Sequence, residues 1–168
     1  QHFTLNNVTV QPKPVFPPDG LPPIWIGGRS EAAMRRTARI GDGWLVSQAT
    51  PEEVKVGIKK IKAWAEAYGR GIEADHYGTL FSFCFADSRA QAARLAAPYM
   101  LRRRPDVDYN TFSAFGGPED FIELMQRYVD AGAEKFVARP ACPPELMQEQ
   151  LAILGGEIIA RYHGTHDV

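Results

Sequence analysis

One stretch of the sequence combines residue types that could hold a phosphate group. Residues 22–33 read PPIWIGGRSEAA, which is a short apolar run, then Gly27 and Gly28, then Ser30 at an expected helix start. Glycines let the backbone turn sharply and approach a ligand closely, and a serine in this place can cap the helix. Free backbone N–H groups at a helix N-terminus favour an anion, most commonly a phosphate. The stretch therefore predicts a phosphate site formed by Gly27, Gly28, Arg29 and Ser30.

The same residues also fit a plain tight connection between a strand and a helix. Two consecutive glycines are a weak signal, and the sequence has neither a GxGxxG fingerprint nor a GxxxxGKS or GxxxxGKT loop. Arg29 could add positive charge to a phosphate site, and its side chain could equally point to solvent. The residues alone leave both interpretations open.

Further polar side chains follow other expected strands. Ser47 and Gln48 lie at the end of the strand expected over residues 44–47, and Arg139 ends the strand expected over residues 135–139. Ligands of parallel barrels bind at the carboxyl ends of the strands, so Ser47 and Arg139 are candidates for substrate contacts. A structural ion pair explains Arg139 equally well.

The sequence shows no pairing of a nucleophile with a base, so catalytic residues are not assigned. Asp106 and Asp108 share a loop and are interpreted as solvated charges. The histidines lie in the termini or at a strand start, where we expect exposed or structural roles: His2, His76, His163 and His166.

Alternating strands and helices must position these side chains. The strands are expected over residues 24–26, 44–47, 76–86 and 135–139. The helices are expected over residues 31–40, 51–68, 89–97, 118–131 and 143–162. The clearest start is Thr50-Pro51-Glu52-Glu53, a capping box with proline at the first helical position. Alternation of this kind means right-handed crossovers and a parallel sheet, either a small doubly wound sheet or half of a TIM barrel of ~250 residues.

Two segments fall outside this alternation. Residues 1–23 contain many prolines and are expected to form an extended lead-in on the surface. Residues 100–117 are expected to form an insertion loop, in which Arg102, Arg103 and Arg104 precede several aromatic residues. The loop could be an active-site lid that binds substrate, or a solvated connection. Residues 1–168 are interpreted as one domain.

The composition excludes several classes of protein. The chain of 168 residues has 45% hydrophobic residues and a formal charge of -1, which gives no bias towards nucleic acid or an anionic membrane. It has no apolar run of the roughly 18 residues needed for a membrane span, and no signal-peptide pattern. Cys84 and Cys142 have no CxxC spacing, so no metal site is expected. We expect a cytoplasmic protein, and the start at Gln1 suggests a processed or truncated product.

The run PPIWIGGRSEAAMRRTARIGDGW resembles the bacterial luciferase-like family of flavin-dependent oxidoreductases, and FTLNNVTVQPKPV is similar to the segment that precedes it there. The resemblance extends through nearly the whole chain. It implies that the flavin phosphate binds at Gly27, Gly28, Arg29 and Ser30. Some relatives carry a further hydroxyl at the position of Ala33, so one phosphate contact is missing here. The resemblance also implies the last four βα units of an eight-unit TIM barrel.

The family implies a flavin-dependent monooxygenase that uses reduced FMN and oxygen on a small organic substrate. Some relatives use a deazaflavin coenzyme for hydride transfer instead. A third hypothesis is a catalytically inert half barrel that is structural or only binds phosphate. Half a barrel exposes its edge strands and inner face, so we expect either a homo-oligomer or association with the missing N-terminal half.

Overall fold

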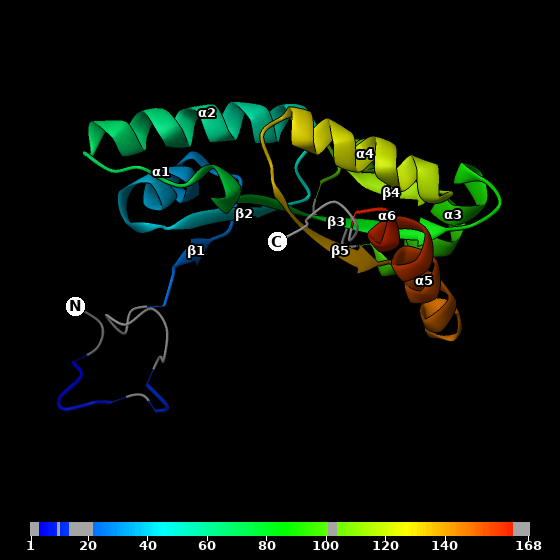
Figure 1. The fold of residues 1–168 in the computed structure, drawn as a ribbon, viewed down its shortest axis with the longest axis horizontal. Coiled ribbons are helices and arrows are strands. Elements are labelled where there is room, and N and C mark those ends of the chain that lie inside the picture. Colours follow the sequence, from blue (N-terminus) through cyan, green and yellow to red (C-terminus); the bar gives the residue numbers. More distant parts are fainter. Residues whose placement is uncertain (1–3, 10, 14–21, 101–103, 163–168) are drawn as a thin grey trace.

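The computed structural model describes residues 4–9, 11–13, 22–100 and 104–162. From Trp25 onwards the described residues form alternating strands and helices (Figure 1). The strands are β1 (Trp25–Ile26), β2 (Gly43–Ser47), β3 (Tyr77–Phe85), β4 (Ser113–Gly116) and β5 (Lys135–Pro140). The helices are α1 (Glu31–Ile40), α2 (Pro51–Ala67), α3 (Arg89–Ala96), α4 (Pro118–Asp130), α5 (Met147–Ile153) and α6 (Ala160–Tyr162). A π-helical turn, Leu154–Ile159, separates α5 from α6, so the predicted last helix is divided into shorter pieces.

All strand pairs are parallel, and the strands expected from the sequence lie side by side. β1 pairs with β2, β2 pairs with β3, and β3 pairs with β5. Their carboxyl ends therefore lie at one edge of the sheet. This arrangement confirms the predicted parallel α/β sheet.

β4 is a strand that the sequence did not predict, and it lies within the expected insertion of residues 100–117. Its register runs from Ser82↔Ser113 to Phe85↔Gly116, whereas β2 pairs with β3 from Tyr77 to Leu80. Because β5 pairs with Gly78 to Phe83 on the opposite edge, β2 and β4 share one edge of β3 end to end. The insertion thus continues the sheet beyond β2.

The two faces of the sheet differ in burial. On one face, which α2 and α4 cover (Figure 1), Phe81 is 1% exposed and its ring lies 5.1 Å from that of Phe121 and 5.6 Å from that of Tyr128. On the other face, Leu45 and Leu80 are only partly buried and Val137 is 41% exposed. The helical side forms a complete core, as expected for the outside of a barrel, while the inner side stays partly open.

The helix starts follow the capping residues of the sequence. Thr50 and Glu53 form the predicted capping box of α2, with Pro51 in the first turn. Ser30 and Ser88 cap α1 and α3 with their side chains. These caps fix where each helix begins after its strand.

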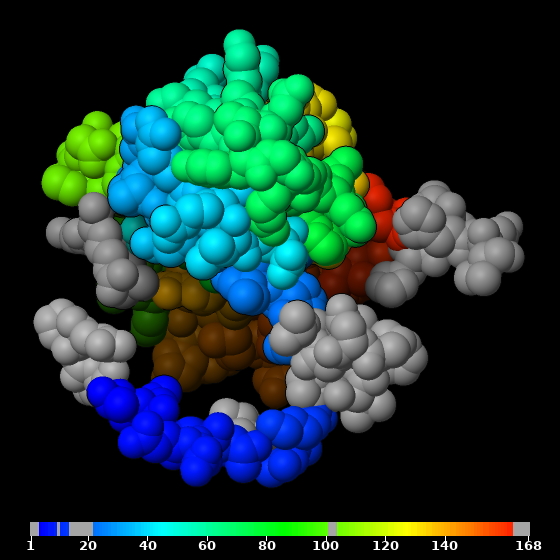
Figure 2. Space-filling view, turned by 90° about the vertical axis from the view of Figure 1, so that its left-hand side faces the viewer, coloured from blue at the N-terminus to red at the C-terminus, as the bar shows by residue number. Residues whose placement is uncertain are grey.

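The described lead-in residues, 4–9 and 11–13, are exposed and form neither a helix nor a strand. In Figure 2 they lie apart from the layer formed by α1 and α2. The extended lead-in over residues 1–23 therefore stays a prediction, and the remainder of 1–21 lies outside the described residues.

Candidate functional site

The turn after β1 has a backbone conformation that requires glycine. Gly28 has φ +111°, a value that side chains rarely permit, and a Cβ on it would lie 3.0 Å from the Cβ of Ala33. The indole Nε1 of Trp44 donates to the carbonyl oxygen of Gly28 at 3.0 Å. The turn is therefore fixed by its own backbone and by β2.

The start of α1 leaves amides that can bind an anion. Ser30 Oγ accepts from the amide of Ala33 at 3.2 Å, and this helix has ten residues. The described part of the chain supplies no acceptor for the amides of Arg29, Ser30 and Glu31. These N–H groups lie at the positive end of the helix dipole, where a phosphate is stabilised. The residues present therefore fit a phosphate group.

An open hollow adjoins these amides. It has a volume of about 520 Å³ and is lined by Gly28, Arg29, Ser30, Ser47 and Gln48. A smaller hollow of about 180 Å³ shares Ser47 and Gln48 with it. The remaining residues that line the smaller hollow are Leu80, Phe81, Ser82, Phe112 and Arg139. The structure thus brings the predicted phosphate residues together with Ser47 and, through the second hollow, with Arg139.

Arg139 already has a contact within the protein. Its Nη2 donates to the carbonyl oxygen of Tyr99 at 2.6 Å, so the contact is with a backbone group and not an ion pair. Phe112, which the sequence analysis did not single out for the site, is 3% exposed and borders the same hollow. Phe112 directly precedes β4, a strand that no local pattern predicted, and for this reason its place at the hollow could not be predicted.

The charges around the turn are arranged around Arg104, the last of three adjacent arginines. Its side chain is only 6% exposed and pairs with Glu53 and Asp106 at 2.9 Å each. The hydrogen bond from Arg104 lowers the pKa of Asp106, and the charge of Arg29 lowers it further. Burial acts to raise the pKa of Glu53, but hydrogen bonds from Arg104 and Thr50 outweigh it. Asp106 is 63% exposed, as a solvated charge would be, but it also pairs with Arg104, whose own side chain is buried.

The described histidine lies at the opposite end of the sheet. His76 immediately precedes β3, and its Nδ1 lies 2.8 Å from the carbonyl oxygen of Asp42. Glu73, Asp75 and His76 bring possible ligand atoms within 4.8 Å of one another, but Asp75 already pairs with Lys135 at 2.7 Å. The group carries no metal assignment. The other three histidines, at positions 2, 163 and 166, lie outside the described residues.

Comparisons with known proteins agree with this architecture. The family model described as luciferase-like monooxygenase matches residues 1–135.

Among the described residues, no helix is both long and apolar enough to cross a bilayer.

Three solved structures share the fold. The coenzyme F420 dependent tetrahydromethanopterin reductase from Methanopyrus kandleri is 18% identical to this chain, with a TM-score of 0.61. The matched region covers 83% of this chain and 50% of the reductase chain. The EDTA monooxygenase from Chelativorans sp. BNC1 is 17% identical, with a TM-score of 0.61, and the match covers 86% of this chain and 46% of the monooxygenase chain. The oxygenating constituent of 3,6-diketocamphane monooxygenase from Pseudomonas putida, in complex with FMN, is 14% identical, with a TM-score of 0.60. This match covers 82% of the present chain and 48% of the oxygenating constituent. The chain spans about half the length of these structures, as a half barrel would.

Proposed function

The chain belongs to the luciferase-like monooxygenase family, and on that premise we propose that it contributes the phosphate site of a flavin-dependent monooxygenase that binds FMN. The observation that carries this proposal is the run of amides from Arg29 to Glu31, which have no acceptor in the described part of the chain and lie at a turn whose Arg29 and Ser30 line an open hollow. A phosphate there accepts hydrogen bonds from these N–H groups. One similar structure contains FMN, which supports this choice of cofactor.

Each residue of the turn has a distinct part in binding. Gly28 provides the backbone bend, and the hydroxyl of Ser30 can donate to a phosphate oxygen while its lone pair caps α1. Arg29 adds positive charge at the edge of the hollow. When bound, the flavin supplies the redox chemistry, and the protein supplies position and electrostatics.

Ser47 and Arg139 are proposed to contact the substrate or the rest of the cofactor. Both line the smaller hollow beyond the phosphate turn. Nη2 of Arg139 donates to Tyr99, and the described residues provide no acceptor for Nε and Nη1, so these two nitrogens can donate to a ligand. A small organic substrate held there would lie beside apolar Leu80 and Phe112.

We propose that the inner face of the sheet is covered by another half of a barrel, either an N-terminal half or a second copy of the chain. The partly open inner face, with Leu45, Leu80 and Val137, supports this association. A stable monomer of the chain at high concentration in light scattering would contradict it.

A second candidate is a hydride-transfer oxidoreductase that uses a deazaflavin coenzyme. It is favoured by the similar fold of the reductase that depends on coenzyme F420, and the phosphate turn alone does not distinguish the two cofactors. Spectral titration of the full encoded protein with FMN and then with the deazaflavin separates the two candidates, because the proposal requires tighter binding of FMN. If the 168-residue chain alone binds neither cofactor at millimolar concentration, the inert half barrel is favoured for this chain.

A further inference from the structure

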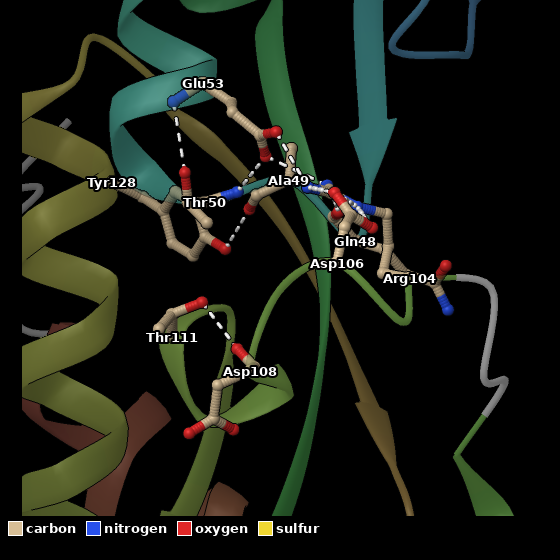
Figure 3. A network of polar contacts seen from close by, with 9 residues as sticks. All are labelled: Gln48, Ala49, Thr50, Glu53, Arg104, Asp106, Asp108, Thr111 and Tyr128. Carbon is tan, nitrogen blue, oxygen red and sulfur yellow. Dashed lines mark hydrogen bonds and ion pairs between the residues drawn. The ribbon is translucent and has the colours of Figure 1, made fainter.

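A buried guanidinium joins the segment after residue 103 to the turn between β2 and α2. Arg104 Nη1 donates to the carbonyl oxygen of Gln48 at 2.9 Å and to Glu53 at 3.1 Å, and Nη2 donates to Glu53 at 2.9 Å (Figure 3). Its Nε and Nη2 also donate to Asp106 at 3.0 and 2.9 Å. Only arginine has a planar fork of donors that can serve three such partners together.

The turn between β2 and α2 consists of residues 48–50, and a side chain forms a hydrogen bond with the backbone of each of them. Gln48 has φ +53°, a conformation that costs free energy for a residue other than glycine. The buried hydroxyl of Tyr128 donates to the carbonyl oxygen of Ala49 at 2.7 Å. The amide of Thr50 donates to Glu53 at 2.8 Å (Figure 3). An unfavourable backbone conformation therefore persists because side chains from outside the turn hold it.

This turn forms one wall of the candidate phosphate site. Ser47 and Gln48 line the same hollow as Gly28, Arg29 and Ser30. Movement of Gln48 would change the width of that hollow directly. The contact between Arg104 and the Gln48 carbonyl thus reaches the site through one residue.

We propose that Arg104 is a positioning residue that fastens residues 104–112 to the turn of residues 47–50 and so keeps the candidate phosphate site in a binding shape. The effect on phosphate binding rests on the proposed function, whereas the fastening itself does not. The far end of the fastened segment is fixed as well, because Phe112 is 3% exposed and lines the smaller hollow.

Charge gives Arg104 a second effect on the same site. Arg29 and Glu53 line one hollow, and Arg104 pairs with both Glu53 and Asp106, so the charges of these groups lie close to one another. The charge of Arg29 accordingly acts to lower the pKa of both carboxyl groups. With Arg104 present, the two carboxylates face two guanidinium groups. Without it, the carboxylates would attract Arg29 and repel an incoming phosphate dianion. Arg104 therefore keeps Arg29 available to a phosphate.

The experiment measures two quantities on the full encoded protein, namely hydrogen exchange of the amides of residues 47–50 and affinity for FMN. We expect R104A to raise the exchange rate of these amides about tenfold and to lower the affinity for FMN about tenfold. In R104A/D106N one repelling charge is removed, so FMN affinity should recover about threefold while exchange stays fast. R104K keeps the charge but loses the fork, and should speed exchange with a smaller loss of affinity.

Arg89 offers a matched control. It pairs with Asp120 and Glu123. Asp120 accepts from the amide of Gly117, the capping residue of α4, much as Glu53 accepts from Thr50, the capping residue of α2. R89A should leave both measured quantities unchanged, because Arg89 lies outside the candidate site.

The outcomes separate the fastening from the function. Unchanged exchange in both R104A and R104K overturns the proposal, as does fast exchange with unchanged FMN affinity. Failure of the double variant to regain affinity overturns the electrostatic part. If the unsubstituted protein binds no FMN, the proposed function fails, and exchange alone decides whether Arg104 holds the turn. If R104A does not fold, R104K and D106N provide the same comparison.

Discussion

Two turns of this molecule have the same sequence pattern and different surroundings. Gly27-Gly28 leads from β1 to α1, and Gly116-Gly117 leads from β4 to α4. Gly28 has φ +111° and Gly116 has φ +138°, so both turns use the freedom of glycine. At the second turn, Asp120 Oδ2 accepts from the amide of Gly117 at 2.7 Å. At the first turn, the described residues provide no such acceptor.

The difference is determined by one position in each helix. Three residues after the capping residue, α4 has Asp120 and α1 has Ala33. The carboxylate of Asp120 takes the place that an external anion could occupy, and Arg89 pairs with it at 2.6 Å. A strand followed by two glycines and a helix is thus insufficient for an anion site. The amides must also be left without an internal acceptor.

The most severe test gives the first turn an acceptor of its own. A33E creates a Ser-x-x-Glu capping box on α1, like that of Thr50 and Glu53 on α2, and places a negative charge at the proposed phosphate site. We expect FMN affinity to fall about a hundredfold, or about 2.7 kcal/mol, in a fluorescence titration. A33S is the control, because it adds only a hydroxyl and should preserve binding. Equal affinities of A33E and the unsubstituted protein would refute the role of this turn.

Removing the backbone freedom of the turn should have the next largest effect. G28A forces a side chain into φ +111° and towards Ala33, so we expect the free energy of unfolding to fall by about 1–2 kcal/mol. G117A is the control, because Gly117 has φ -93° and a Cβ there meets no atom within 4 Å. Urea denaturation of both variants makes the comparison, and equal losses would contradict it.

Removing the internal acceptor from the second turn, Gly116-Gly117, should have the smallest effect on stability and binding. D120A removes the acceptor of the Gly117 amide and a partner of Arg89, which should cost about 1 kcal/mol of unfolding free energy by loss of a helix cap. FMN affinity should not change, because this turn lies away from the candidate site. D120N keeps an acceptor oxygen and should lose less stability. A clear decrease in FMN affinity in D120A would show that the two turns are coupled.

The sequence predicted the regular elements because their signals are local. The capping box at Thr50 and Glu53 and the apolar run before Gly27 depend on neighbouring residues, and each lies where it was expected. The strand expected over residues 76–86 is β3, and its Phe81 packs against Phe121 of helix α4.

What the sequence did not predict depends on contacts between distant residues. β4 has four residues, and only its pairing with β3 makes it a strand. Arg104 had no assigned role in the expected insertion loop, yet its side chain is buried and contacts Glu53, which lies 51 residues earlier. The contrast between the two glycine turns likewise appears only when Asp120 is seen to reach back to Gly117.

Comparison of FMN with riboflavin tests the central claim most directly, because riboflavin lacks only the phosphate. In equilibrium titrations of the full encoded protein, we expect FMN to bind at least about tenfold more tightly than riboflavin, since several charge-assisted hydrogen bonds to the phosphate are at stake. Inorganic phosphate should weaken FMN binding and leave riboflavin binding unchanged. Equal affinities for FMN and riboflavin would contradict a phosphate site at Gly27 to Ser30.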